Sequence, residues 1–431
     1  MEASCRGRWL LLLGFAFPLQ TLAEPNRTIS LRLERKVASL GDSAAGYTPK
    51  AFYVGSVEVG DREHLQSMQV AFETASGSVV LDSTRCTSPA CLKHRRYAPN
   101  HAVELNRAGG VVRTGETAIL SVDYNEEGSA SGSINGDMIR DSICLGTGAG
   151  RLCAEFGLLA AEKMTDAPFT QLPMDGLVGL SLHGLSISEP FNFLRTLGLN
   201  GLARRFGLFL PSAAKPGPAE LTLGGHNPDR TASNITWVPV EQPEKGFWQV
   251  RIESVWVGSE KLDFCSAGCR AIIDSSSSHL TVPSEVMPTL MEKLAVQAPK
   301  SWFSEKELCN EATGAPLTFV LSNGQKLTLD AKDYAGPEGK DCVAQLHPWD
   351  VEERKSTGTR REGDRVVAAG VSLESLVLGE PLLRKYYTVF DADHSRLGFA
   401  LARAESAEPD TIVLMQGLTK QTRPRRKRPE L

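Results

Sequence analysis

Two segments of the sequence carry a carboxylate in the same local setting. Residues 72–76 read FETAS and residues 273–277 read IDSSS, so each has an apolar residue, a carboxylate, a hydroxyl, a small residue and a hydroxyl. Each is followed by an apolar segment that ends in glycine: Gly179 lies 106 residues after Glu73, and Gly379 lies 105 residues after Asp274. Matched signatures at nearly equal offsets indicate an internal repeat and therefore a duplicated lobe.

The repeat suggests a chemistry for the two carboxylates. A two-fold relation between the lobes would bring Glu73 and Asp274 together, and two carboxyl groups at contact distance share a proton. One can then act as general base on a water while the other polarises a peptide carbonyl. The alternative is that both are turn residues that accept hydrogen bonds from nearby N–H groups. A single such motif would favour that alternative, whereas the repeat favours a shared site.

The elements that would position these loops are mostly short strands. Glycine, asparagine and serine punctuate apolar segments that predict strands at residues 51–59, 68–72, 220–223, 248–257 and 386–391. Few helices are expected, for example at 189–197 and 284–296. Residues 352–365 are rich in charge and predict an exposed loop. Many strands and few short helices indicate an all-β protein.

The amino-acid composition excludes few classes of protein. The 431 residues are 41% hydrophobic and 23% charged, which is ordinary for a globular protein. The formal net charge of −4 argues against a globally basic nucleic-acid binder, so no nucleic-acid partner is expected.

The N-terminus predicts secretion. Arg6 and Arg8 precede an apolar run from Trp9 to Phe17, and small residues lead to Ala23. This order is typical of a signal peptide over residues 1–23. The alternative, a membrane anchor, needs about 20 apolar residues, more than this run contains. We therefore expect a secreted or lumenal product of the secretory or endolysosomal pathway, without a stable membrane anchor.

The cysteines agree with that compartment. Cys5 lies in the predicted signal peptide, and the remaining eight form an even set. An even set in an oxidising compartment suggests four disulfides. Zinc ligation is the alternative, but the close pairs have no histidine at zinc-finger spacing. The eight are Cys86, Cys91, Cys144, Cys153, Cys265, Cys269, Cys309 and Cys342.

At these motifs the chain resembles the pepsin-like aspartic peptidases. That family has an apolar-Asp-[Thr/Ser]-Gly-[Ser/Thr] loop in each lobe, followed by an apolar-apolar-Gly segment. The matching segments here are 71–76, 175–180, 271–277 and 377–391, while 237–240 and 247–250 look like the crossing between lobes. The resemblance implies a bilobal all-β fold with a few short helices. The expected divisions are a signal peptide at 1–23, a possible short propeptide at 24–50, an N-terminal lobe at 51–236, a C-terminal lobe at 237–403 and a basic tail at 404–431.

The resemblance also assigns roles to residues. It implies that Glu73 and Asp274 are the catalytic pair and that Tyr124 is the tyrosine of the flap. Supporting loop positions are Thr74, Ala75, Ser76, Ser275, Ser276 and Ser277, of which Thr74 and Ser275 tie the loops together while Ser76 and Ser277 bond the carboxylates. It pairs Cys86 with Cys91, Cys265 with Cys269 and Cys309 with Cys342, which leaves a Cys144–Cys153 bond as an addition.

The chain departs from the family at the loops themselves. Glu73 replaces the first aspartate, Ala75 and Ser276 replace both loop glycines, and Val80 replaces a tryptophan that supports the flap tyrosine. An extra methylene moves a carboxyl group by roughly 1.5 Å, and a misplacement of ~1 Å can cost about a hundredfold in rate. Two functions follow. One is an acid endopeptidase that uses the Glu73–Asp274 pair; the other is a pseudoprotease that binds polypeptides without cutting them. Neither needs a metal or an organic cofactor, and we expect a monomer.

Overall fold

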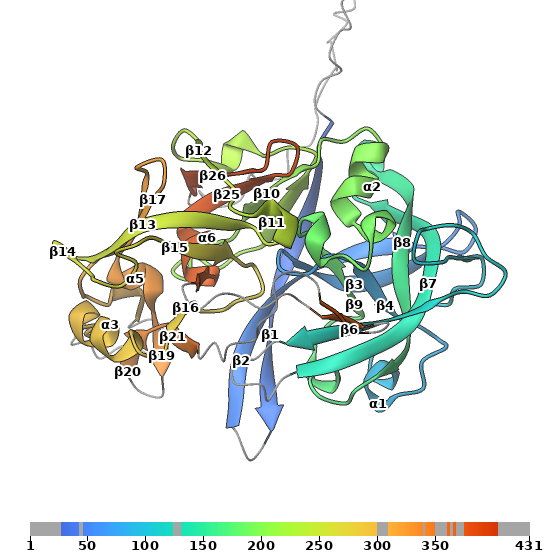
Figure 1. Ribbon diagram of the computed structural model, residues 1–431, viewed down its shortest axis with the longest axis horizontal. Coiled ribbons are helices and arrows are strands. Elements are labelled where there is room, and N and C mark those ends of the chain that lie inside the picture. The colour runs from blue at the N-terminus through green and yellow to red at the C-terminus, as the bar shows by residue number, and fades with distance from the viewer. Residues whose placement is uncertain are drawn as a thin grey trace, which may run out of the picture.

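The computed structural model describes residues 27–42, 46–123, 131–299, 309–338, 341–349, 360–362, 365–367 and 375–403. Strands dominate, as predicted, and they form two lobes with a shared sheet between them (Figure 1). The first lobe, on the right of Figure 1, contains β3 to β9, and the second lobe, on the left, contains β13 to β21 and β24.

The larger sheet runs through the first lobe and the region between the lobes. Within the described residues it has 16 strands. Their bounds are β1 Ile29–Asp42, β2 Gly46–Val59, β3 Gln66–Glu73, β4 Val79–Asp82, β5 Val103–Glu104, β6 Thr117–Asp123, β7 Ser131–Leu145, β8 Leu152–Met164, β9 Gly176–Gly179, β10 Arg205–Phe209, β11 Ala219–Leu223, β12 Thr236–Pro239, β22 Arg360–Glu362, β23 Arg365–Val367, β25 Tyr386–Asp391 and β26 Arg396–Leu401.

The second lobe has its own sheet. Among the described residues it contains eight strands, and a separate pair, β19 with β20, lies beside it. The bounds are β13 Gln249–Val257, β14 Glu260–Lys261, β15 Cys269–Ile273, β16 Leu280–Pro283, β17 Leu317–Leu321, β18 Lys326–Leu329, β19 Ala335–Glu338, β20 Asp341–Ala344, β21 Leu346–Trp349 and β24 Ser375–Leu378.

The two sheets repeat one arrangement of strands. In the first lobe β3 is parallel to β9, β9 is antiparallel to β4, and β4 is parallel to β8. In the second lobe β15 is parallel to β24, β24 is antiparallel to β16, and β16 is parallel to β21. Glu73 and Asp274 occupy equivalent places in this repeat, at the end of β3 and directly after β15. The duplication inferred from the sequence is therefore present in the fold.

Helices are short. They are α1 Pro89–Leu92, α2 Phe193–Leu199, α3 Met287–Leu294, α5 Ala331–Tyr334 and α6 Glu380–Lys385, with 3₁₀ turns η1 Gly148–Gly150, η2 Phe169–Gln171, η3 His183–Leu185, η4 Glu189–Phe191, η5 Pro228–Arg230, η6 Pro243–Lys245 and η7 Cys309–Glu311. The helix expected at 189–197 is split. Glu189 opens a 3₁₀ turn, and α2 begins only after Asn192, whose side chain accepts the Arg195 N–H as a helix cap.

Residues 27–50 include a long strand that the sequence analysis did not predict. Ile29 to Leu33 of β1 pair with β11, and Glu34 to Asp42 pair with β2, so β1 lies inside the larger sheet rather than at its edge. Figure 1 shows β1 and β2, in blue, between the two lobes. Ile29, Leu31 and Leu33 are buried while Ser30 and Arg32 are exposed, the two-residue alternation of a strand with one face in the core. The described part of the possible propeptide is thus part of the folded sheet.

The charged segment between β21 and β24 is not only a loop. β22 and β23 form a hairpin within it, and β23 pairs in parallel with β6 of the first lobe, Arg365 opposite Ile119. A segment of the second half of the chain therefore contributes strands to the first lobe.

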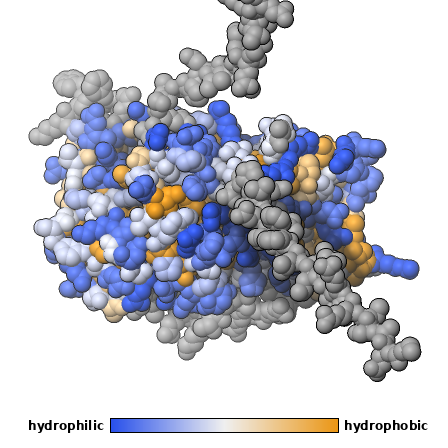
Figure 2. All heavy atoms as spheres, turned by 90° about the horizontal axis from the view of Figure 1, so that it is seen from above, coloured by the Kyte–Doolittle hydropathy of each residue, from blue (hydrophilic) through white to orange (hydrophobic). Residues whose placement is uncertain are grey.

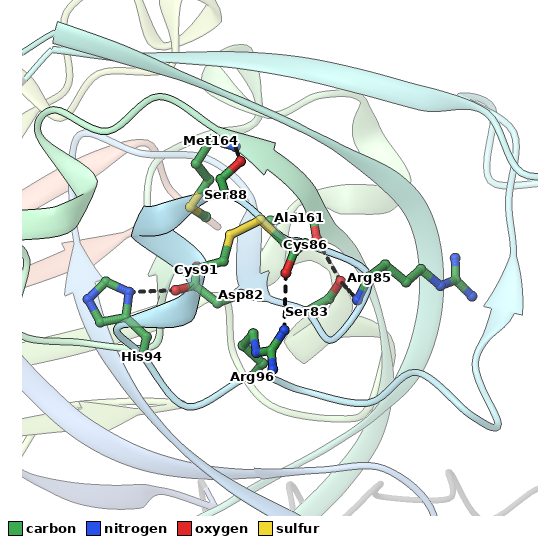
Figure 3. The surroundings of a disulfide bond; sticks show 10 residues. All are labelled: Asp82, Ser83, Arg85, Cys86, Ser88, Cys91, His94, Arg96, Ala161 and Met164. Atoms are coloured by element: carbon green, nitrogen blue, oxygen red, sulfur yellow. Dashed lines mark hydrogen bonds and ion pairs between the residues drawn. A yellow bond between two sulfur atoms is a disulfide. The ribbon is translucent and has the colours of Figure 1, made fainter.

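All eight expected cysteines form disulfides, in the predicted pairs 86–91, 144–153, 265–269 and 309–342. The Cys86–Cys91 bond closes the loop that contains α1, and Figure 3 shows it together with the neighbouring pair of Asp82 and His94. Cys144 and Cys153 face each other across the β7–β8 pair. The described residues contain no helix that is both apolar and long enough to span a bilayer. Seen from above, the surface is mainly hydrophilic with small hydrophobic areas (Figure 2).

Candidate active site

The two loops are fixed by the strands that precede them. Glu73 pairs with Gly179 at the end of the β3–β9 ladder, and its carbonyl accepts the Leu180 N–H at 2.8 Å. Ile273 pairs with Leu378, and the Asp274 N–H donates to the Leu378 carbonyl at 3.2 Å. In both lobes the carboxylate residue therefore leaves the sheet beside the apolar-apolar-Gly segment.

Thr74 and Ser275 join the two loops by four reciprocal hydrogen bonds. The Thr74 N–H donates to Ser275 Oγ at 3.2 Å, and the Ser275 N–H donates to Thr74 Oγ1 at 2.9 Å. The hydroxyl of Thr74 donates to the Ile273 carbonyl at 3.0 Å, and that of Ser275 donates to the Phe72 carbonyl at 3.1 Å. Both side chains are buried. This two-fold arrangement brings the residues before Glu73 and Asp274 together, although they are about 200 positions apart in the chain.

Gly179 and Gly379, which end the two apolar-apolar-Gly segments, are required by close backbone contacts. A Cβ on Gly179 would lie 2.4 Å from the Ser76 carbonyl oxygen, and one on Gly379 would lie 2.2 Å from the Ser277 carbonyl oxygen. Both contacts are far inside van der Waals distance, so each loop can lie against its apolar-apolar-Gly segment only because these positions are glycine.

Ser276 binds the carboxylate of its own loop. Its N–H donates to Asp274 Oδ1 at 2.8 Å, and its hydroxyl lies 2.9 Å from Oδ1 and 3.0 Å from Oδ2. One hydroxyl proton is thus directed between both carboxylate oxygens. The sequence analysis identified Ser276 only as a bulkier residue at a glycine position, and nothing in the sequence indicates where its hydroxyl points.

Glu73 is far less exposed than a typical carboxylate. Its relative exposure is 4%, whereas Asp274 is partly exposed. A glutamate at the end of a buried strand needs polar partners or a proton, because an isolated charge in such a place is costly. Its side chain is one methylene longer than the family's aspartate.

The remaining predicted site residues are three further loop positions and the expected flap tyrosine. Ala75 and Ser76 are partly exposed beside Glu73. The Ser277 hydroxyl donates to the His279 carbonyl at 3.2 Å. Tyr124, the expected flap tyrosine, falls outside the described residues.

Val80, which the sequence analysis matched to a tryptophan position of the family it resembles, lines a small cavity. The space, about 20 Å³, is shared with Asp82, His94 and apolar side chains. His94 Nδ1 lies 2.7 Å from Asp82 Oδ2, and Nε2 lies 3.0 Å from the Leu172 carbonyl oxygen (Figure 3). Each ring nitrogen of His94 therefore faces an acceptor. Both hydrogen bonds are made when Asp82 and His94 together carry one proton more than an ionised carboxylate and a neutral imidazole would.

Trp248 is a site residue that the sequence analysis placed only in the crossing between lobes. Its ring is fully buried, and its carbonyl accepts the Ile273 N–H at 2.8 Å. A large apolar residue at the start of the strand predicted over residues 248–257 is the only sequence signal of this role.

Glu380 adjoins the second loop and connects it to β1. Its N–H donates to the Ser277 carbonyl at 2.8 Å, and its carboxylate binds Arg35, Arg384 and the Tyr53 hydroxyl. Burial disfavours the Glu380 carboxylate, but the hydrogen bond from Arg35 and the charges of Arg384 and Arg35 outweigh it, so the pKa of Glu380 is lowered. Burial, followed by the Glu380 charge, raises the pKa of Tyr53.

A second cavity lies away from both loops. It measures about 800 Å³ and is lined by α2, by Pro243 and Glu244, and by Ala392 and Asp393 after β25. Neither Glu73 nor Asp274 lines it. Among the described residues, the histidine, cysteine and acidic groups with the spacing of a metal site are Asp61, His64 and His101, which are also outside the two loops.

Comparison with known proteins agrees with this geometry. The family model "Eukaryotic aspartyl protease" matches residues 52–402. Mouse gastricsin is 29% identical over 371 residues, which cover 84% of each chain. Human gastricsin is 27% identical over 369 residues, covering 84% of this chain and 85% of its own. Rabbit pepsin II-2/3 is 27% identical over 355 residues, covering 82% and 81%.

Proposed function

Since the chain belongs to the eukaryotic aspartyl protease family, we propose that it is a polypeptide-binding protein of the secretory pathway in which peptide hydrolysis is weak or lost. The polypeptide would bind between the lobes, where the family binds its substrates. The protein would act as a monomer and without a metal or organic cofactor at the Glu73–Asp274 loops.

The contact between Ser276 and Asp274 carries this proposal. In hydrolysis by a carboxylate pair, the oxygens of both groups hold and activate one water. Here the Ser276 hydroxyl lies at 2.9 and 3.0 Å from the two Asp274 oxygens and competes with that water for their lone pairs. A glycine at this position has no such hydroxyl.

Glu73 weakens hydrolysis further. Its extra methylene displaces the carboxyl group by roughly 1.5 Å, while catalytic groups are generally held within about 0.5 Å of the productive geometry. Two independent departures at one reaction centre support a site that binds more than it cuts.

The framework around the loops supports continued binding of polypeptides. Thr74 and Ser275 keep their reciprocal hydrogen bonds, and Gly179 and Gly379 keep their close contacts. These features hold the two lobes in a fixed relation at the loops, which is what a peptide bound across both lobes requires.

A second candidate is an acid endopeptidase of low activity. The preserved Thr74–Ser275 interaction favours it, because those groups have no chemistry of their own and serve to align the two carboxylate loops. In this version Glu73 and Asp274 activate water together, and Tyr124 covers the bound peptide.

Cleavage of a denatured protein between roughly pH 3 and 7 separates the candidates. The variants are Asp274→Ala, Glu73→Asp, and a triple revertant that adds Ala75→Gly and Ser276→Gly to Glu73→Asp. We expect wild type to cut no faster than Asp274→Ala and the triple revertant to gain at least ~10- to 100-fold, about 1.4–2.7 kcal/mol of barrier. Ser277→Ala is the matched control, because its hydroxyl binds the His279 carbonyl, and it should gain nothing.

Binding is measured on the same proteins with a labelled unfolded polypeptide. Wild type and Asp274→Ala should bind it with similar affinity. Robust wild-type cleavage that Asp274→Ala abolishes would establish the endopeptidase instead. A folded triple revertant that binds but does not cut would argue that the loss of activity has another cause than these three residues.

Secretion is tested separately. The predicted signal peptide over residues 1–23 and the four disulfides support an oxidising compartment. Expression of the full chain in secreting cells should yield oxidised protein in the medium or the endolysosomal lumen, with its N-terminus at Glu24. Protein retained in the cytosol with residues 1–23 intact would contradict this part of the proposal.

A further inference from the structure

Asp61, His64 and His101 lie together on the surface of the first lobe. Asp61 and His64 belong to the turn between β2 and β3, and His101 lies just before β5. Their donor atoms all lie within 4.8 Å of one another. His64 Nδ1 is 3.0 Å from Asp61 Oδ1, and His101 Nε2 is 3.6 Å from Asp61 Oδ2. The two imidazole rings stack at 5.0 Å with 18° between their planes.

The turn that carries Asp61 and His64 is fixed by its own backbone. Asp61 Oδ1 accepts the N–H groups of Glu63 at 2.9 Å and His64 at 2.8 Å. Gly60 has φ +115°, and a Cβ there would lie 2.7 Å from the His64 carbonyl oxygen, so a close approach that only glycine permits brings His64 back toward Asp61.

The segment that carries His101 is clamped to this turn. The Gln66 side chain binds the Ala98 backbone twice, donating to its carbonyl at 3.0 Å and accepting its N–H at 2.8 Å. Arg95 adds a bond from Nη1 to the Ser67 carbonyl at 2.6 Å. These contacts hold two segments that are distant in sequence in register, which is the positioning that a ligand site requires.

The distances fit a tetrahedral ion. With bonds of about 2.0–2.1 Å to nitrogen and oxygen, neighbouring ligand atoms of Zn²⁺ are about 3.3 Å apart. His64 Nδ1 lies 3.0 Å from Asp61 Oδ1 and His101 Nε2 lies 3.6 Å from Asp61 Oδ2, so each imidazole nitrogen is near that separation from one of the two carboxylate oxygens. Two imidazoles and one carboxylate suit Zn²⁺, whereas Ca²⁺ and Mg²⁺ prefer oxygen ligands.

We propose that Asp61, His64 and His101 bind one Zn²⁺ ion, with water at the remaining coordination position. The ion joins the β2–β3 turn to the segment before β5 and stabilises the first lobe at a place separate from the Glu73–Asp274 loops. The sequence did not predict these ligands, because the two histidines are 37 residues apart and form no familiar zinc motif.

Titration calorimetry of the full, tag-free chain with ZnCl₂ near neutral pH tests the site. We expect one ion per chain with a dissociation constant on the order of 10 μM, and a loss of at least about 10-fold in both His64→Gln and His101→Gln. His394→Gln is the matched control. His394 follows Asp391 with the same spacing as His64 follows Asp61, but Arg205 and Arg396 occupy that carboxylate. It should bind Zn²⁺ like wild type.

Two further measurements make the test independent of folding. The thermal midpoint of wild type should rise with Zn²⁺ but not with millimolar Ca²⁺, and the two ligand variants should match wild type without metal, since all three side chains are at least partly exposed. Co²⁺ bound to wild type should give the visible absorption of a tetrahedral site. Equal Zn²⁺ affinity in wild type and either ligand variant, or no binding to wild type, would overturn the proposal.

Discussion

The indole N–H of Trp248 donates to the Leu180 carbonyl at 2.9 Å, and this bond links the two halves of the repeat. Leu180 in turn donates its N–H to the Glu73 carbonyl, while the Trp248 carbonyl accepts from Ile273 beside Asp274. One buried residue thus connects the backbones of both carboxylate loops, in addition to the direct bonds of Thr74 and Ser275.

Trp248→Phe removes this bond but keeps an aromatic ring. It leaves the Leu180 carbonyl without its buried donor and creates a small void, so we expect a loss of about 2–4 kcal/mol in the free energy of unfolding. Urea denaturation measures it. Trp256→Phe is the control, because that ring is partly exposed and donates to the Ser254 hydroxyl, which can rotate to another partner. Equal losses in the two variants would contradict a special role for Trp248.

Glu380→Gln should destabilise the contact between β1 and the second loop. The amide keeps the shape but leaves Arg35 and Arg384 beside a neutral, buried group. Because Arg35 is 37% exposed, the expected loss is discounted to about 1–3 kcal/mol. Glu189→Gln breaks an exposed pair with Arg195 and should reduce stability less than Glu380→Gln does. Chemical denaturation of both variants near neutral pH provides the comparison.

Acid should weaken the fold through His279 and His347. Burial and the positive charge of Lys50 lower the pKa of both imidazoles below the ordinary 6.5. As the pH falls through 6.5, the unfolded chain binds more protons than the folded one, and the free energy of unfolding decreases. The double variant His279→Asn/His347→Asn should therefore lose less stability than wild type between about pH 7 and 5. His183→Asn, at an exposed position, should follow wild type, and identical slopes in all three proteins would refute the assignment.

His94 should have the opposite effect on the way the free energy of unfolding changes with pH. Burial lowers the pKa of its imidazole, but the hydrogen bond and charge of Asp82 outweigh burial, so the pKa of His94 is raised. Burial likewise raises the pKa of Asp82, more than the bond to His94 lowers it. The stability that His94 contributes is present below its unfolded value of 6.5 and is lost as the pH rises through the folded value. Wild type should lose more stability than His94→Gln above about pH 6.5, which denaturation at a series of pH values can measure. A wild-type curve parallel to that of the variant would exclude this effect.

The repeated loops and the close cysteine pairs could be predicted because their signals are local, whereas the Cys309–Cys342 pair, 33 residues apart, was implied by the resemblance. Cys86 and Cys91, for example, are close enough in sequence to be bridged wherever the chain goes, and Cys144 and Cys153 face each other on paired strands. The apolar-apolar-Gly segments could also be recognised in the sequence. Their glycines lie at close backbone contacts, where another residue would displace the loop.

Side-chain direction and long-range contacts could not be predicted in the same way. Ser276 and Ser277 are adjacent serines, yet only the fold determines that the first binds the Asp274 carboxylate and the second binds the His279 carbonyl. The strand at residues 29–42 was missed although its alternation of buried and exposed residues begins at Ile29, because residues 24–50, several of them basic, were interpreted as a possible short propeptide. Arg35, one of those basic residues, binds the buried Glu380.

Because β1 lies inside the sheet, a proteolytic cut after it would not release the N-terminal segment from the folded protein. If a processing enzyme cut the chain between Asp42 and Gly46, β1 would still be hydrogen-bonded to β11 on one part of its length and to β2 on the other, with Ile29, Leu31 and Leu33 in the core. The product would be a two-chain species that migrates as one unit in native gels and separates into fragments only when it is denatured.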